Sequence, residues 1–231
     1  LRMMFAAWYF SDNIGNRAIA LFAMNLLEQS LKVNKVSMTR QPSEQRREAI
    51  LSTAIALFRT KGLLQTSTRD LTEALGISRS HIYHYFPNWQ ALCLAALEHY
   101  MQQDLHELEG ELAAMQPEAA LKRLTEWVLP DEIDPDWLIY ADAWQIAARD
   151  EAYKALAQRV TADWNGLIEQ VITRGDEAGV FHCQDVAQAT RLLSGAINGC
   201  ADMVSLEPNE RSRQQALADI VTLIKVLLQP T

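Results

Sequence analysis

The segment 67–86 constrains the fold more than any other part of the chain, because two short helical patterns meet at a glycine inside it. Ser67 is a good N-cap residue, and Asp70 three positions later completes a capping-box arrangement. This pair predicts a helix over 68–75. Gly76 follows at once and can adopt the left-handed backbone conformation that a tight turn requires.

A second short helix is predicted directly after this turn. Ser78 can cap it and Pro87 stops it, which limits the helix to 79–85. Ile82 and Phe86 are the apolar residues that hold it against the first helix. Its remaining side chains carry hydrogen-bonding groups: Arg79, Ser80, His81, Tyr83, His84 and Tyr85. Such groups contact base edges and phosphates when a helix lies in the major groove of DNA.

The spacing of apolar residues predicts further helices along the chain, with no strand-like alternation. The full set of predicted ranges is 43–61, 68–75, 79–85, 88–112, 118–129, 135–149, 151–178, 185–205 and 208–228. Proline or glycine stands at most of the breaks between these ranges. The predicted fold class is therefore all-α.

Charge is distributed unevenly along the chain, whose net charge is −8. Residues 38–90 carry seven Arg or Lys against four Asp or Glu, whereas residues 101–231 carry ten against twenty-two. A small basic module joined to a large acidic one is the distribution expected when only one end of a protein contacts phosphates.

Nothing in residues 101–231 has the pattern of a catalytic site, such as a nucleophile elbow or a Gly-rich phosphate loop. His81 and His84 have no acidic or cysteine partner at ligand spacing. The three cysteines form no CxxC pair and are expected to be reduced thiols, with a redox sensor as the alternative. We therefore expect no enzyme activity, no catalytic residue, no cofactor and no metal.

Residues 1–37 show no clear relation to the rest of the sequence. The apolar segment 3–10 is too short for a signal-peptide core with a cleavage site, and segment 18–27 falls far below the roughly 20 residues that span a bilayer. We expect Met38 to be the biological start, residues 1–37 to be an upstream extension, and the protein to be cytoplasmic without membrane contact.

Several short motifs around the two helices carry a family resemblance. They are Arg46-Arg47-x-x-Ile50, Ala56-Leu57-Phe58, Gly62, Ser67 to Asp70, Gly76-Ile77-Ser78 and Ile82 to Phe86. Together they resemble the signature of the tetracycline-repressor (TetR) family. The resemblance implies a three-helix DNA-binding domain over 44–104 with its helix-turn-helix at 67–86, and a helical effector-binding and dimerisation domain over 105–231.

The resemblance also implies which residues hold DNA. Tyr83 and Tyr85 would touch phosphates, Ser67 and Thr68 would hold backbone phosphate at a helix N-terminus, and Arg79, Ser80, His81 and His84 would lie nearest the bases. One departure is Trp89, which stands where the family usually has a phosphate-binding lysine. Because indole brings no charge, we expect weaker DNA binding whose salt slope is lower by about one unit.

Aromatic residues stand out in the second half of the chain: Trp127, Trp137, Tyr140, Trp144 and Trp164. They suit either a packed core or the wall of an apolar effector pocket. A second set of residues includes Trp137, Ala143-Trp144, Arg149-Asp150, Trp164, Gly179 to Phe181, Asp185, Gly195 and Asn198-Gly199. This order resembles the C-terminal domain of the choline-sensing BetI-type branch of the family. An aromatic cage with an acid such as Asp142 nearby would suit a quaternary cation.

The last two predicted helices have the apolar stripes of a dimer interface. The residues predicted to form it are Leu193, Ile197, Ile220, Ile224 and Leu227, with Gly195 and Gly199 permitting close approach. Two such helices can pair across a two-fold axis as a four-helix bundle. The alternative is that they only complete the core of one protomer.

These features predict a dimeric transcriptional repressor that a small-molecule effector releases from a pseudo-palindromic operator. Its expected partners are double-stranded operator DNA, an effector and a second copy of the chain. The alternative within the same class is a ligand-independent DNA-binding regulator or an activator. An enzyme that carries a helix-turn-helix is the other alternative, and it would need a catalytic site that the sequence does not offer.

Overall fold

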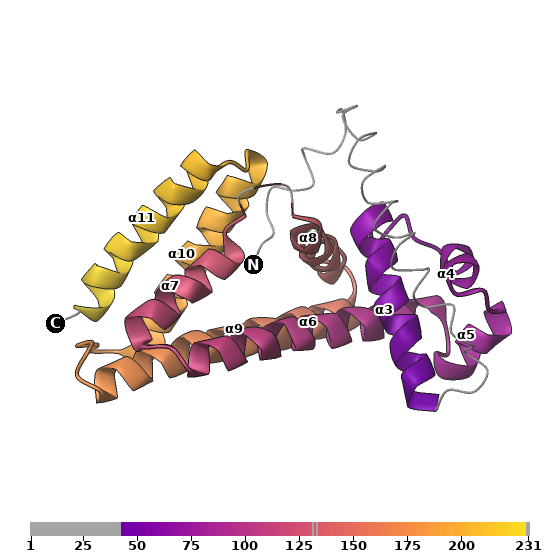
Figure 1. Cartoon of the computed structure of the whole chain (residues 1–231), viewed down its shortest axis with the longest axis horizontal. Coiled ribbons are helices and arrows are strands. Elements are labelled where there is room, and N and C mark those ends of the chain that lie inside the picture. Colours follow the sequence, from indigo (N-terminus) through magenta and orange to yellow (C-terminus); the bar gives the residue numbers. More distant parts are fainter. Residues whose placement is uncertain (1–42, 131, 133, 230–231) are drawn as a thin grey trace. The chain divides into compact units, whose positions relative to one another are not determined.

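A computed structural model of the chain describes residues 43–130, 132 and 134–229, and these contain nine helices and no strand (Figure 1). The helices are α3 (Ser43–Lys61), α4 (Thr68–Leu75), α5 (Arg79–Tyr85), α6 (Trp89–Ala113), α7 (Pro117–Val128), α8 (Pro135–Ala147), α9 (Glu151–Glu177), α10 (Val186–Leu206) and α11 (Glu210–Leu228). The all-α prediction is confirmed, and the predicted helix ends differ from the observed ones by two residues or fewer. The prediction for residues 1–37 and Met38 lies outside the described residues.

The described residues form two compact units. The first unit comprises residues 43–101 and 135–153, which are α3, α4, α5, the first half of α6, α8 and the beginning of α9. The second unit comprises the described residues of 102–134 and 154–229, which are the remainders of α6 and α9 together with α7, α10 and α11. Helix α8 therefore belongs to the same unit as the helix-turn-helix and packs against α3, whereas the predicted domain limits of 44–104 and 105–231 place it in the other domain.

The core of the first unit is built around α3, since seven residues of this helix are buried. Leu71 from α4 and Ile82 from α5 are completely buried, and Phe86 directly after α5 is nearly so. For Ile82 and Phe86 this burial confirms the prediction that they are the apolar residues on the inner side of the second short helix. Gly62 and Gly76 have positive φ angles of 89° and 66°, and they provide the left-handed ends of α3 and α4.

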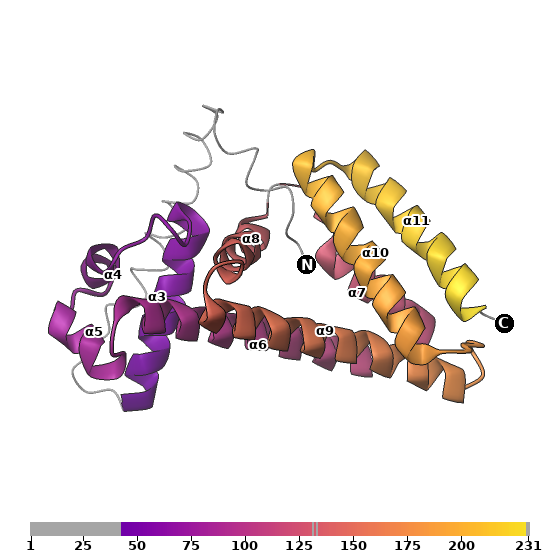
Figure 2. The same ribbon diagram turned by 180° about the vertical axis from the view of Figure 1, so that it is seen from behind.

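The core of the second unit lies among α7, α10, α11 and the parts of α6 and α9 that belong to this unit. Helices α10 and α11 lie side by side, and α7 packs against both (Figure 2). The end of α9 is fixed by Gly179, whose φ is 70°, and by backbone amides of Val180 and Phe181 that both donate to the Gly175 carbonyl. None of the described helices is long and apolar enough to cross a membrane.

Candidate nucleic-acid interface

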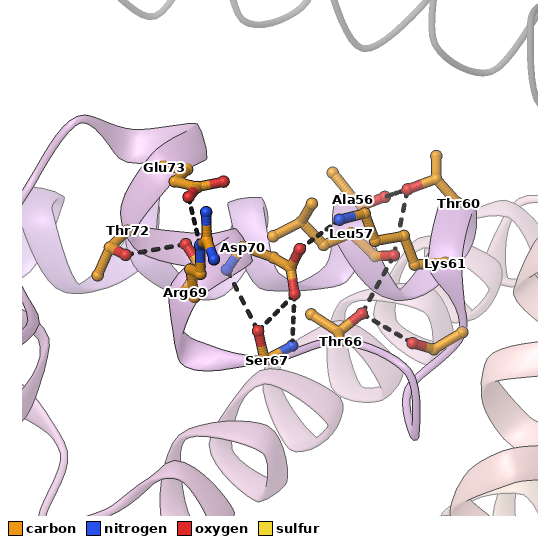
Figure 3. Close-up of polar contacts among 11 residues, drawn as sticks. Ala56, Leu57, Thr60, Lys61, Thr66, Ser67, Arg69, Asp70, Thr72 and Glu73 are labelled. Carbon is orange, nitrogen blue, oxygen red and sulfur yellow. Dashed lines mark hydrogen bonds and ion pairs between the residues drawn. The ribbon is translucent and has the colours of Figure 1, made fainter.

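The corner between α3 and α4 is held by the hydroxyl of Thr66. Its Oγ1 donates to the carbonyl oxygen of Gly62 at 2.7 Å, and it lies 3.5 Å from that of Leu57. Thr66 is buried, so these bonds satisfy carbonyl groups at the end of α3 away from water (Figure 3). The corner therefore places the first residue of α4 in a fixed position relative to α3.

The predicted capping box at the start of α4 is present. The Ser67 hydroxyl accepts a bond from the Asp70 amide at 3.4 Å, and the Ser67 amide donates to Asp70 Oδ2 at 2.9 Å (Figure 3). Lys61 at the end of α3 forms an ion pair with Asp70. The hydrogen bond from Lys61, followed by the bonds from Ser67, holds the pKa of Asp70 far below its ordinary value, so the cap stays charged.

These bonds limit what Ser67 can offer to DNA. Its amide and its hydroxyl both donate to the Asp70 carboxylate, the hydroxyl at 2.6 Å. Both donors of Ser67 are thus engaged inside the protein, which does not favour it as a phosphate ligand. Its role in the described structure is that of a helix cap.

Helix α5 is positioned so that predicted DNA-contacting residues of two helices meet. Ser78 caps α5 by accepting the His81 amide at 3.3 Å, as predicted. The buried Thr68 places its Oγ1 3.3 Å from the hydroxyl of Tyr83, whose side chain is exposed. Thr68 of α4 and Tyr83 of α5, both predicted phosphate contacts, therefore lie next to each other.

The other predicted contacts line the outer side of α5. Arg79, Ser80 and His84 are exposed, and His81 and Tyr85 are half-buried. The imidazole of His84 packs edge-on against the ring of Tyr85, with centroids 5.1 Å apart. This surface offers several different hydrogen-bonding side chains on one short helix, which is what base readout in a major groove needs. Trp89, which stands where the family usually has a lysine, is half-buried in the first turn of α6.

Arg46 lies beside α5 in the structure but is not among the DNA contacts predicted from the sequence. A depression of about 420 Å³ is lined by Ser43, Arg46, Ser80, His81, His84 and Tyr85. Four of these residues belong to α5, and two belong to the first turn of α3. Arg46 was visible in the sequence only as part of the family resemblance, because no spacing rule relates the beginning of α3 to α5 more than thirty positions later.

Helix α8 is bonded to the end of α3 in the first unit. Asp142 Oδ2 accepts the amide of Leu63 at 3.0 Å, and the Arg59 guanidinium forms an ion pair with the Asp136 carboxylate, with Nη2 3.2 Å from Oδ2. Burial raises the pKa of Asp142, and the bond from Leu63 offsets this only in part. Asp142, named from the sequence as an acid that would suit a cation cage, thus bonds the corner before α4, and its part in a cage stays a prediction.

The five predicted pocket aromatics are divided between the units. Trp137, Tyr140 and Trp144 lie on α8 in the first unit, whereas Trp127 on α7 and Trp164 on α9 lie in the second. Trp137 and Trp144 are buried. Among the described residues, the indole Nε1 atoms of Trp137 and Trp164 are shielded from solvent without a hydrogen-bond partner. The effector pocket stays a prediction.

The predicted interface residues on α10 and α11 differ in exposure. Leu193, Ile197 and Ile220 are completely or almost completely buried in the core of the second unit. Ile224 and Leu227 are half-buried. For the first three residues the structure favours the alternative reading, in which these stripes complete the protomer core. Other apolar residues of the same helices are exposed, including Leu192, Met203, Leu206, Val221 and Val226.

The cysteines do not have the surroundings of reactive thiols. Burial raises the pKa of Cys93 to about 12, and it also raises the pKa values of Cys183 and Cys200. A thiol with a raised pKa carries little of the thiolate form that oxidants attack. This does not favour the redox-sensor alternative.

Two short helices joined by a left-handed glycine, with the second presenting polar side chains outward, define a helix-turn-helix DNA-binding protein. The family described as "Bacterial regulatory proteins, tetR family" matches residues 50–96, and "BetI-type transcriptional repressor, C-terminal" matches residues 117–229. The chain belongs to the TetR family of transcriptional regulators.

Known relatives agree with this assignment. The chain is 26% identical over 132 residues to the uncharacterized HTH-type transcriptional regulator YerO of Bacillus subtilis, covering 55% of this chain but only 46% of that protein. It is 28% identical over 153 residues to the HTH-type transcriptional repressor KstR2 of Rhodococcus jostii, covering 64% of this chain and 74% of the relative. The fold is similar to a regulator from Saccharomonospora viridis solved in complex with choline, with a TM-score of 0.69, 23% identity, and coverage of 80% of this chain and 98% of that one.

Proposed function

We propose that this regulator is a dimeric repressor that leaves its operator when a small-molecule effector binds. The observation that carries the effector part is the attachment of α8 to the helix-turn-helix unit. Helix α8 carries three of the five predicted pocket aromatics, and its Asp136 and Asp142 bond the end of α3 and the corner after it. A ligand that favours another position of α8 would act directly on the segment that leads into α4.

Two comparisons support the repressor role and a cationic effector. The C-terminal match is to a BetI-type repressor, and KstR2 is a repressor. The choline complex of the Saccharomonospora viridis regulator makes a small organic cation the first effector class to test. Tyr140 lies 5.7 Å from Trp144 and 6.3 Å from Tyr100, centroid to centroid, and the Arg59 guanidinium lies 5.0 Å from the Tyr100 centroid. The Tyr100 ring already carries the Arg59 guanidinium, whereas Tyr140 and Trp144 contribute further aromatic rings of the kind that bind cations.

In the proposed dimer, α10 and α11 of two copies pair. Leu192, Met203 and Leu206 are 49%, 66% and 40% exposed, and they recur at helical spacing with Gly195 and Gly199 along one side of α10. A Cβ atom at either glycine would meet nothing within 4 Å in the protomer. Glycine costs a helix about 1 kcal/mol relative to alanine, and close approach of a second copy gives a reason for that cost. Exposed apolar residues beside them fit the same partner.

The proposal is tested by footprinting the wild-type protein on the DNA upstream of its gene. We expect protection of a two-fold-symmetric site, two protomers per duplex by light scattering, and weaker binding when choline or another member of a panel of organic cations and neutral apolar compounds is added. Binding that no compound in the panel alters would favour the ligand-independent alternative. Protection without two-fold symmetry, or one protomer per site, would contradict the dimer.

The link through α8 makes a separate prediction about Asp142. Replacing it with alanine leaves the buried Leu63 amide without its acceptor, and an unsatisfied buried donor costs about 1–3 kcal/mol. We expect faster hydrogen exchange at the Leu63 amide, lower stability and weaker DNA binding. Asp142→Asn keeps an acceptor oxygen and should retain both the protection and the binding.

The charge of Asp142 gives the asparagine variant a pH signature. Because burial raises the pKa of Asp142, ionisation of this carboxyl opposes folding. The stability that the protonated carboxyl contributes is present in acid and is lost as the pH rises through the raised pKa. Asp142→Asn should therefore match or exceed the wild-type stability at neutral pH and lose any advantage in acid.

The matched control is Asp163→Ala, which removes an exposed carboxylate of α9 in the second unit. Unchanged exchange at Leu63 in Asp142→Ala would contradict the link.

A further inference from the structure

We propose that Arg46 in the first turn of α3 binds the sugar–phosphate backbone of DNA, and that it forms one phosphate-binding depression together with α5. The inference rests on the proposed binding of DNA through α5, and it adds a contact from a different helix. The chemistry of its side chains identifies the ligand of this depression as a phosphodiester group, next to the bases that α5 is proposed to contact.

The side chains around the depression suit an anion. All six lining residues carry a hydroxyl, imidazole or guanidinium group, and none of the six carries a carboxylate. Arg46 provides the permanent positive charge, and a guanidinium matches the geometry of phosphate oxygens. A site whose side chains can all donate hydrogen bonds, with one cation and no carboxylate among them, favours a negatively charged group.

One polar atom of His81, a residue that lines this depression, lacks a partner. Among the described residues, Nε2 of His81 is shielded from solvent and has no hydrogen-bond partner. Shielded polar atoms in proteins nearly always have a partner, and leaving one without it costs free energy. His81 lines the depression together with Arg46, and a rotation of the imidazole that exposes Nε2 would let it bond a phosphodiester group bound there.

The neighbouring Arg47 has the same side chain as Arg46 but a different position, and it does not line the depression. Its guanidinium carbon lies 5.4 Å from the centroid of the Phe86 ring, which is buried behind α5. Arg47 therefore serves packing, whereas Arg46 borders the depression. Arg46 also supplies positive charge to a domain in which Trp89 replaces the lysine usual in the family. The salt slope of DNA binding should consequently be steeper than the lowered slope expected from the loss of the lysine at Trp89.

The test measures the salt slope of DNA binding for the wild type and for Arg46→Gln, on the upstream duplex and on a scrambled duplex of equal length. One lost phosphate contact lowers the slope of log K against log salt by about 0.9 per bound protomer. We expect this decrease on both duplexes, because a phosphate contact carries no sequence information. Arg46→Lys should restore most of the slope.

Arg47→Gln is the control, since it removes an equal charge from the adjacent position. We expect it to lower the melting temperature while the salt slope stays near the wild-type value. A wild-type slope in Arg46→Gln would overturn the inference, as would a loss confined to the upstream duplex, which would mean base readout. If the wild type binds neither duplex in a salt-dependent manner, the proposed function itself fails, and that outcome is distinguishable from the others.

Discussion

Replacing Phe181 with alanine is expected to lower the free energy of unfolding by about 3–5 kcal/mol, as is typical for removal of a fully buried phenyl ring. Phe181 has no exposed surface, and its ring packs in the core of the second unit against Gly175 of α9. The measurement is urea unfolding followed by circular dichroism. Wild type and variants must be compared at one protein concentration, because association would add to the apparent stability.

Gly175 gives this prediction a second arm. A Cβ atom at residue 175 would overlap the Cδ2 and Cε2 atoms of Phe181, so Gly175→Ala should cost about 1–3 kcal/mol despite the better helix propensity of alanine. The matched control is Gly166→Ala in the same helix, where a Cβ would meet nothing within 4 Å. That variant should gain up to about 1 kcal/mol in the protomer.

Combining the two core substitutions tests the packing itself. In the double variant Gly175→Ala with Phe181→Ala, the added methyl group enters space that the ring has left. The two costs should therefore sum to more than the measured cost of the double variant. Additive costs would mean that Phe181 does not pack on Gly175 as described.

The helix-turn-helix could be predicted almost completely from the sequence because its determinants are local. The capping pair Ser67 and Asp70, the left-handed Gly76 and the cap Ser78 all act within four residues of their partners. Such short-range rules fix helix ends independently of the rest of the chain. For the same reason the predicted ranges of α3, α4 and α5 agree with the structure to the residue.

Long-range partners could not be predicted in the same way. Asp142 has the residue type and the neighbours of a cation-binding acid, yet its oxygen accepts an amide 79 positions earlier in the chain. Leu193 and Ile197 have the spacing of an interface stripe, and the same stripe also satisfies a protomer core. Helical periodicity says which side of a helix is apolar, but not which neighbour covers it. Only tertiary packing decides between these readings.

Replacing Arg79 with alanine should weaken binding to the operator by roughly one to four orders of magnitude. Arg79 is exposed at the first position of α5, the end from which a recognition helix contacts bases. A lost bidentate contact to a base costs about 1–3 kcal/mol, and a dimer loses it in both half-sites. The measurement is the dissociation constant for the footprinted site at fixed salt.

The duplex used for comparison separates base readout from charge. On a scrambled duplex, Arg79→Ala should lose no more affinity than one phosphate contact per protomer would supply, because base contacts carry the specificity. Lys122→Ala on α7 removes an exposed positive charge outside both the helix-turn-helix and the proposed dimer helices, and it should leave both affinities unchanged. Equal losses on the two duplexes would assign Arg79 to the backbone instead. The bases would then be read by Ser80, His81 and His84, the other predicted base contacts of α5.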